Sequence, residues 1–212
     1  MLNSDKYNIL ILLKKRNTYI IIVVICMKIM VGVSNRHIHL KQEDYNVLFG
    51  NKKMELLRAV NQPGEYASNL VVTLKTDKNE IKNVRVMGPI RSYSQAEVSK
   101  TDSFTLGINP LIRKSGNTTG TCMIEVVGPN GSVEIPVIMA ERHIHISKVM
   151  LEKYGWDEHK EKMVLVNTTK GGIIANVKLK VTDDSFFEIH LDTDDANAFL
   201  LKSGDIVDII EN

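Results

Sequence analysis

A short string that contains two histidines occurs twice in this chain. The first copy is Ser34-Asn35-Arg36-His37-Ile38-His39-Leu40 and the second is Glu141-Arg142-His143-Ile144-His145-Ile146-Ser147. Side chains alternate between the two faces of a β-strand, so the histidines of each string share one face and the aliphatic residues the other. Neutral imidazole is a common ligand of zinc and similar ions. The repeated pattern therefore predicts two metal-binding positions, each built on a strand.

Each histidine pair needs a further ligand, because a catalytic zinc usually has three protein ligands and one open position. The candidates are Glu97, within Gln95-Ala96-Glu97-Val98, and His190, within an apolar, strand-like segment. The simpler interpretation of His190 is a hydrogen-bonded core histidine, and that of Glu97 is a surface carboxylate. His159 lies among charged residues and is expected in solvent.

Arginines close to these candidates suggest an anion. Arg91 follows a Gly-Pro turn just before Glu97, and Arg113 precedes Lys-Ser-Gly-Asn. A guanidinium beside a metal cation is unfavourable unless an anion such as phosphate joins them, and its fork matches that oxyanion. A surface arginine paired with a carboxylate is the simpler interpretation. No GxSxG nucleophile motif occurs, and Cys122 is expected to be a buried small hydrophobe, so we expect chemistry without a covalent enzyme intermediate.

Composition narrows the class of protein. The 212 residues suffice for one large or two small domains, and 43% of them are hydrophobic and 25% charged. A net charge of +2 without aromatic-basic interleaving gives no indication of nucleic-acid binding. Two cysteines without a CxxC motif favour a reducing cytosol. Within residues 1–30, neither apolar run approaches the ~20 residues that a membrane-spanning helix needs.

Short Val- and Ile-rich segments between Gly, Pro, Asn and Asp predict a mainly β protein. The expected strands are 20–26 continuing into 31–33, 36–40, 70–76, 81–87, 123–127, 132–140, 163–167, 172–181, 186–191 and 206–210. Short helices are expected at 41–49, 94–100, 147–154 and 194–201. Both histidine strings precede a short helix, which indicates a pseudo-duplicated architecture of small barrels or a sandwich. The absence of a βαβ repeat disfavours Rossmann and TIM folds.

Several strings together resemble the phosphate propanoyltransferase family, the phosphotransacylases associated with bacterial microcompartments. The resemblance extends over about residues 31–210 and follows the order of the family's motifs. The strings that carry it are Gly32–Leu40, Gln62–Ala67, Arg85–Arg91, Gln95–Ser99, Thr101-Asp102, Ala140–His145 and Asp192–Ala198. The resemblance implies a fold of two six-stranded β-barrels with short capping helices and an active site between them. It divides the chain into an N-terminal extension (1–30), a first barrel (31–35 plus 143–212) and a second barrel (36–142).

The resemblance also implies an activity, namely reversible conversion of acyl-CoA and phosphate to acyl phosphate and CoA with two zinc ions per chain. The implied ligands are His37, His39 and Glu97 for one zinc, and His143, His145 and His190 for the other. Arg91 is the implied catalytic, phosphate-binding residue. The implied contacts to CoA, which is a substrate, are Val33, Ser34 and Asn35, with Lys78, Arg85 and Asn197 further out.

The expected partners are therefore small molecules and not nucleic acid. No membrane span is expected, and the sequence does not decide between a monomer and a homo-oligomer. Residues 1–30 lack the amphipathic helical pattern of the family's microcompartment members. A free cytoplasmic enzyme is thus expected at least as strongly as one inside a bacterial microcompartment. Propanoyl and acetyl groups differ by one methylene, which a pocket separates by only ~1–3 kcal/mol.

Two other classes compete with this interpretation. A cupin-like metal enzyme also combines HxH, Glu and a later His, but its Glu follows the HxH closely, whereas Glu97 comes far after His39. An amidohydrolase barrel would need a longer chain of βα repeats. A non-catalytic metal-binding microcompartment module would not require Arg91 or the 193–197 segment, and the presence of both favours catalysis.

Overall fold

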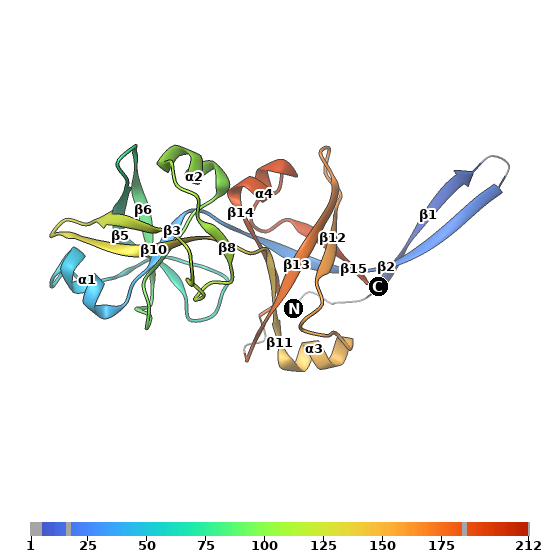
Figure 1. Cartoon of the computed structure of the whole chain (residues 1–212). Coiled ribbons are helices and arrows are strands. Elements are labelled where there is room, and N and C mark those ends of the chain that lie inside the picture. Colours follow the sequence, from blue (N-terminus) through green and yellow to red (C-terminus); the bar gives the residue numbers. More distant parts are fainter. Residues whose placement is uncertain (1–5, 16–17, 184–185, 212) are drawn as a thin grey trace. The chain divides into compact units, whose positions relative to one another are not determined.

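The computed structural model describes residues 6–15, 18–183 and 186–211 (Figure 1). The chain divides into two compact units. Of the described residues, those within 1–33, 142–191 and 195–212 form the terminal unit, and those within 34–141 and 192–194 form the central unit. Each unit has its own hydrophobic core of buried residues.

The terminal unit is a closed β-barrel. Its ring runs in the order β2-β14-β11-β13-β12-β15, and β15 pairs back onto β2, which makes six strands among the described residues. The bounds are β2 (Thr18–Ser34), β11 (His143–Ser147), β12 (Lys162–Val166), β13 (Gly172–Thr182), β14 (Glu188–Asp192) and β15 (Ile206–Glu211). Outside the ring, β1 (Tyr7–Lys15) pairs with the first part of β2 as an antiparallel ribbon (blue in Figure 1). Closure pairs the barrel strands on both sides and leaves no open edge within the ring.

The central unit is a second closed barrel. The ring runs in the order β5-β6-β3-β7-β10-β9 and closes through the β5–β9 pairing, again with six strands in the described part of the chain. The bounds are β3 (His37–His39), β5 (Tyr66–Lys75), β6 (Glu80–Gly88), β7 (Gln95–Glu97), β9 (Met123–Val127) and β10 (Ser132–Ala140). Two short strands, β4 (Leu56–Ala59) and β8 (Leu111–Arg113), add to β5 and β10 outside the ring. The prediction of a mainly β fold with two six-stranded barrels is confirmed.

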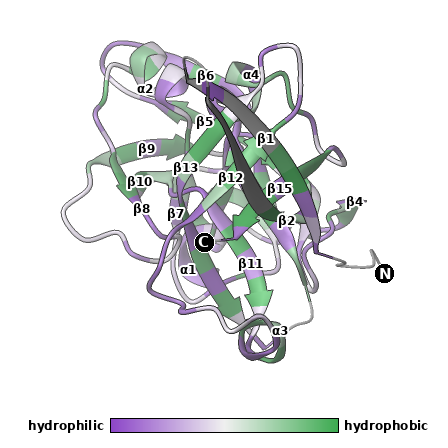
Figure 2. Cartoon of the chain, turned by 90° about the vertical axis from the view of Figure 1, so that its right-hand side faces the viewer, coloured by the Kyte–Doolittle hydropathy of each residue, from purple (hydrophilic) through white to green (hydrophobic). Residues whose placement is uncertain are grey.

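Short helices join the strands of both units. They are α1 (Gln42–Phe49), α2 (Lys100–Leu106), α3 (Lys148–Tyr154) and α4 (Thr193–Ala198). Figure 2 shows hydrophobic, green segments along the barrel strands, whereas the connecting loops are mainly purple and white. Within the ranges that the structure describes, no helix has the length and apolarity needed to span a membrane.

Each of the two histidine strands lies between one parallel and one antiparallel partner strand. In the central unit β3 pairs parallel to β6 and antiparallel to β7. In the terminal unit β11 pairs parallel to β13 and antiparallel to β14. Each histidine strand is followed by a short helix, α1 or α3. The duplication predicted from the two strings is therefore present at the level of strand pairing.

One predicted helix is wrong. Residues 94–100 contain the strand β7, in which Ala96 is completely buried between β3 and β10. The helix α2 begins only at Lys100, where Ser99 and Asp102 form a reciprocal capping box. The apolar spacing of a three-residue strand is too short to distinguish from a helical turn.

The barrel of the terminal unit includes residues before position 31. β2 pairs with β15 from Ile25, opposite Glu211, to Met30, opposite Ile206. Cys26, Met27 and Ile29 have no exposed surface. These residues, which the sequence-based division placed in the N-terminal extension, therefore belong to the barrel strand and its core.

Candidate metal centres and anion site

The first candidate metal centre lies in the central unit. The donor atoms of His37, His39 and Glu97 all lie within 4.8 Å of one another. β3 supplies both histidines, and β7 places Glu97 directly opposite His37 in the antiparallel register. The Nε2 of His37 is 3.7 Å from Oε2 of Glu97, and the two side chains are 12% and 11% exposed. On the other face of β3, Ile38 is completely buried in the core, as the alternation predicted.

The second nitrogen of His37 is held by the backbone. Its Nδ1 lies 2.8 Å from the carbonyl oxygen of Asn35. A carbonyl oxygen only accepts, so Nδ1 carries the proton and Nε2 keeps its lone pair on the side of Glu97. Such an outer contact orients a metal-binding imidazole and fixes its tautomer.

Glu97 is also held in place, by Gln95 two residues earlier on β7. The completely buried Gln95 donates from Nε2 to Oε1 of Glu97 (2.7 Å) and to Oγ of Ser115 (3.1 Å). Its Oε1 accepts from the backbone N–H of Gly116 at 2.9 Å. One amide thus fixes both the carboxylate and the 115–116 loop. Sequence reasoning gave no role to Gln95, although its spacing from Glu97 puts both on one face of the strand.

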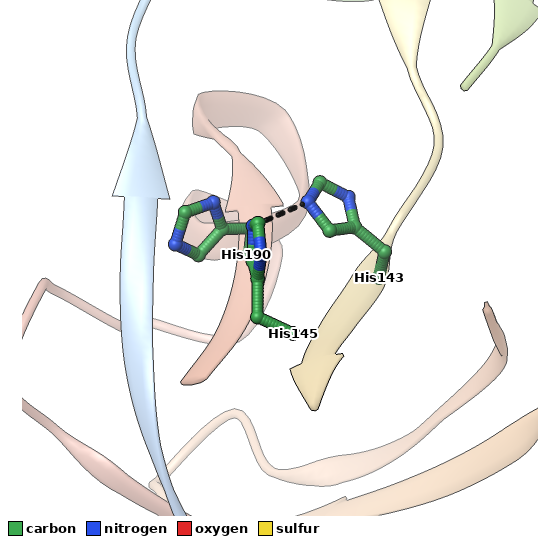
Figure 3. Close-up of side chains that lie close together, drawn as sticks. All are labelled: His143, His145 and His190. Atoms are coloured by element: carbon green, nitrogen blue, oxygen red, sulfur yellow. Dashed lines mark hydrogen bonds between the residues drawn. The ribbon is translucent and has the colours of Figure 1, made fainter. Parts of the chain in front are cut away.

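The second candidate centre lies in the terminal unit and consists of His143, His145 and His190 (Figure 3). β11 carries the first two, and β14 places His190 directly opposite His143. The Nε2 atoms of His143 and His145 are 3.1 Å apart, and the ring of His190 lies 4.5 Å from that of His145 between centroids. In both units the third donor therefore stands across the strand pair from the first histidine.

The environment of His145 keeps its imidazole neutral. Burial, followed by the neighbouring His190, His143 and Lys180, lowers its pKa from 6.5 to about 2. A neutral imidazole has a lone pair available for a metal, whereas imidazolium has none.

Both groups fit zinc. Tetrahedral coordination with Zn–N bonds near 2.0–2.1 Å separates two ligand atoms by about 3.3 Å. The corresponding separations in this structure are 3.1 Å between the Nε2 atoms of His143 and His145 and 3.7 Å between Nε2 of His37 and Oε2 of Glu97. Three histidines, and two histidines with one carboxylate, are both ligand sets found in catalytic zinc sites.

Arg91 lies beside the end of the first histidine strand. Its backbone N–H donates to the carbonyl oxygen of Leu40 at 2.9 Å, directly after His39. The guanidinium forms an ion pair with Glu65 and donates to the hydroxyl of Tyr93 at 2.6 Å. This pairing with a carboxylate is the contact that the simpler interpretation of Arg91 predicted, and the guanidinium can pair with an oxyanion by the same geometry.

The six residues expected to contact CoA are distributed over both units. In the central unit, Ser34 and Asn35 precede and contact His37, and Arg85 pairs with His37 across β6 and β3. Arg85 donates to the carbonyl oxygen of Ser68 at 3.0 Å. Lys78 is an exposed cation in the turn between β5 and β6.

The other two expected contacts belong to the terminal unit. The backbone N–H of Val33 donates to Oγ of Ser203 at 3.0 Å, and Asn197 is exposed on α4. His159, expected in solvent, has a side chain that is 86% exposed.

Comparison with known proteins identifies the family. A family model described as phosphate propanoyltransferase matches residues 30–202. The chain belongs to the phosphate propanoyltransferase family. A phosphate propanoyltransferase of Thermotoga maritima is 43% identical over 187 residues, which cover 86% of this chain and 89% of the relative. Those of Rhodopseudomonas palustris (41%, covering 86% and 82%) and Salmonella typhimurium (43%, covering 80% and 82%) are also similar.

Membership of the phosphate propanoyltransferase family makes this chain an enzyme, an acyltransferase that acts on small molecules. The match spans parts of both barrels and includes every candidate ligand and Arg91. The resemblance drawn from the strings is therefore confirmed at the level of family, fold and enzyme class.

Proposed function

We propose that this protein is a zinc-dependent phosphate acyltransferase that reversibly converts acyl-CoA and phosphate to acyl phosphate and CoA. The acyl group is propanoyl or acetyl. The observation that carries the proposal is the pair of three-donor groups, each built on a histidine strand and its antiparallel neighbour, in a member of the phosphate propanoyltransferase family. The proposal assigns one zinc to each group, and thus two to each chain.

Bound zinc would supply Lewis acidity for a carbonyl or phosphate oxygen and would stabilise the CoA sulfur as a thiolate. The role of the protein is to present neutral imidazoles and an oriented carboxylate. Burial keeps His145 neutral, and the hydrogen bond to the carbonyl oxygen of Asn35 fixes the tautomer of His37. The hydrogen bond from Gln95 orients the carboxylate of Glu97.

Arg91 binds phosphate in this proposal. The fork now holds the carboxylate of Glu65 and contacts Tyr93, so an incoming phosphate would share or replace the carboxylate. Arg91 would then orient one phosphate oxygen for attack on the thioester carbonyl and offset the negative charge.

Acyl transfer is direct in this proposal. A phosphate oxygen forms the new C–O bond, the C–S bond breaks, and the sulfur leaves with the electron pair. No side chain becomes acylated. A stable acyl-enzyme seen by intact mass spectrometry would count against this step.

For CoA we propose contacts from Val33, Ser34 and Asn35, with Lys78, Arg85 and Asn197 further out. The contacts of Ser34 and Asn35 with His37 support a location of the thiol end near that imidazole. The exposed ammonium of Lys78 suits a CoA phosphate. We propose the cytoplasm as the location, with a bacterial microcompartment as the alternative.

The decisive experiment measures phosphate-dependent release of free thiol from propanoyl-CoA and from acetyl-CoA, with and without a chelator. Release that requires phosphate and stops after chelation supports the proposal, and the ratio of the two rates identifies the preferred acyl group. No release from either substrate by zinc-replete protein would favour another acyl group, a cupin-like enzyme or a non-catalytic metal-binding module. CoA binding in a thermal-shift assay then separates the first of these from the other two.

A further inference from the structure

A buried acid, Glu188, stands next to the three-histidine group. It lies two residues before His190 on β14, so the two side chains are on the same face of the strand. Its side chain is 6% exposed, and its Oε1 is 3.1 Å from Nε2 of His190. In the strand pairing it stands opposite His145. A carboxylate is rarely buried without a charged or donating neighbour, so the burial of Glu188 needs a structural explanation.

Glu188 is not a member of the donor group itself. The three histidine donor atoms lie within 4.8 Å of one another, and Glu188 is not among the residues of that set. The acid therefore lies outside the ligands and touches one of them, His190. This is the relation of a carboxylate that orients a metal-binding histidine from behind.

The contact determines which ring nitrogen is available. A carboxylate oxygen accepts hydrogen bonds, and Oε1 of Glu188 lies 3.1 Å from Nε2 of His190, so this geometry favours the tautomer with the proton on Nε2. In that tautomer Nδ1 holds the lone pair. His37 has the opposite arrangement, because its Nδ1 donates to Asn35.

Gly32 on β2 makes room for this pair. A Cβ at position 32 would lie 2.2 Å from Oε1 of Glu188 and 2.9 Å and 3.0 Å from Cδ2 and Nε2 of His190. The first two distances are too short for real atoms unless the flexible side chains withdraw, and the third is tight. A glycine inside a strand often marks such a close approach. The backbone of β2, the blue strand beside His190 in Figure 3, thus confines the acid and the imidazole together.

We infer that Glu188 is a positioning residue that holds His190 with its proton on Nε2, so that the terminal group binds its metal through Nδ1 of His190. This rests on the proposed function only for the presence of a metal. It goes beyond that proposal by adding a residue outside the ligands and by naming the ligating atom.

The direct test uses the unaltered protein with isotope-labelled histidine, loaded with cadmium in place of zinc. Scalar coupling between the metal and a ring nitrogen identifies the ligating atom by NMR, and His190→Gln assigns the signal. We expect coupling at Nδ1 of His190 and a retained proton on Nε2. Coupling at Nε2 of His190 would overturn the inference.

The second test measures zinc affinity by competition with a chromophoric chelator, in a His37→Ala background that removes the central group. Glu188→Ala should weaken binding about tenfold or more, and Glu188→Gln, which keeps an acceptor oxygen but no charge, should weaken it less. Glu158→Ala, at an exposed acid after α3, is the matched control and should leave affinity unchanged. An affinity of Glu188→Ala within twofold of the control would overturn the inference.

The two proposals can fail separately. Coupling at Nδ1 together with weaker zinc binding by Glu188→Ala supports the role of Glu188, whatever the thiol-release assay shows. A failure to release thiol would overturn only the proposed function. If Glu188→Ala does not fold, the NMR measurement on the unaltered chain still decides the inference.

Discussion

Arg91 carries a guanidinium that already holds an anionic group in this structure, the carboxylate of Glu65. The same side chain donates to Tyr93, so its fork is fixed from two sides. A side chain held in this way loses little further conformational freedom when an oxyanion binds. At the scale of single residues, phosphate binding to Arg91 therefore requires that the anion share the guanidinium with Glu65 or displace that carboxylate.

Substitution of Arg91 should affect phosphate more than CoA. Arg91→Lys keeps the charge but loses the fork, so we expect the KM for phosphate to rise about tenfold, which corresponds to about 1.4 kcal/mol. Arg91→Ala should raise it further or abolish turnover. Steady-state thiol release at varied phosphate measures this, with the exposed Arg58→Ala on β4 as control. Unchanged phosphate kinetics in Arg91→Lys would contradict the assignment.

The lowered pKa of His145 predicts how the metal-free protein responds to acid. The unfolded chain takes up a proton at this residue near pH 6.5, but the folded chain does so only near pH 2. The folded state therefore binds fewer protons, and its stability falls as the pH drops below about 6.5, by at most about 1.4 kcal/mol per pH unit from this group.

Thermal unfolding of chelator-treated protein between pH 7.5 and 5 should therefore show a falling Tm. In His145→Gln, which cannot titrate, we expect a shallower decline over the same range. Parallel curves for the two proteins would mean that other groups cause the acid sensitivity.

At the scale of elements, the short strand β7 both completes the ring of the central barrel and carries a candidate metal ligand. Its three residues supply the buried Gln95, the core residue Ala96 and the candidate ligand Glu97. Gln95 links the ligand to the 115–116 loop through three hydrogen bonds. Replacement of this amide should therefore affect both stability and metal binding.

Gln95→Met keeps the volume but removes both the donor and the acceptor. The variant leaves the Glu97 carboxylate and the Gly116 N–H without this partner, so we expect a loss of about 1–3 kcal/mol in the free energy of unfolding. We also expect about tenfold weaker zinc binding at the central group. Urea denaturation and chelator competition in a His143→Ala background measure the two effects. Full metal affinity in a destabilised variant would reduce Gln95 to a structural role.

The sequence predicted what depends on local pattern. The i, i+2 spacing of the histidines placed the aliphatic residues in the cores, where Ile38 and Ile144 are completely buried. Strands were expected at 123–127 and 132–140, and β9 and β10 occupy these ranges and pair antiparallel. In contrast, residues 94–100 were expected to be helical although β7 lies there, because three residues show no reliable period.

Contacts between distant segments could not be read from local pattern. The register that sets Glu97 opposite His37 and His190 opposite His143 is a property of strand pairing, which periodicity does not reveal. The family resemblance supplied the expected ligand sets. The outer contacts from Gln95 and Glu188 were missed, because a buried amide or acid in a strand is recognisable only once its neighbours are known.

At the scale of the whole molecule, the pairing of β2 with β15 sets a limit on N-terminal truncation. Removal of residues 1–24 deletes β1 and most of the β2 segment that pairs with it, but leaves the β2–β15 pairing from Ile25 to Met30. Removal of residues 1–30 also deletes Met27 and Ile29 from the core. We expect the first variant to keep a Tm within a few degrees of the full chain, and the second to lose cooperative unfolding of the terminal unit.

Circular dichroism and calorimetry of the two variants measure this difference. A variant lacking residues 1–24 that fails to fold would show that the ribbon has a structural role. A variant lacking residues 1–30 that melts normally would contradict the assignment of Met27 and Ile29 to the core.

The two donor groups share no residue, and each is completed by strands of one unit. If metal binds, occupancy of one group does not require a ligand from the other, so species with one ion per chain can exist. When metal is scarce, the population would follow the two separate affinities instead of an all-or-none step. Titration of the metal-free chain would then pass through a half-loaded form, observable by native mass spectrometry, and the onset of activity would lag behind the uptake of the first ion.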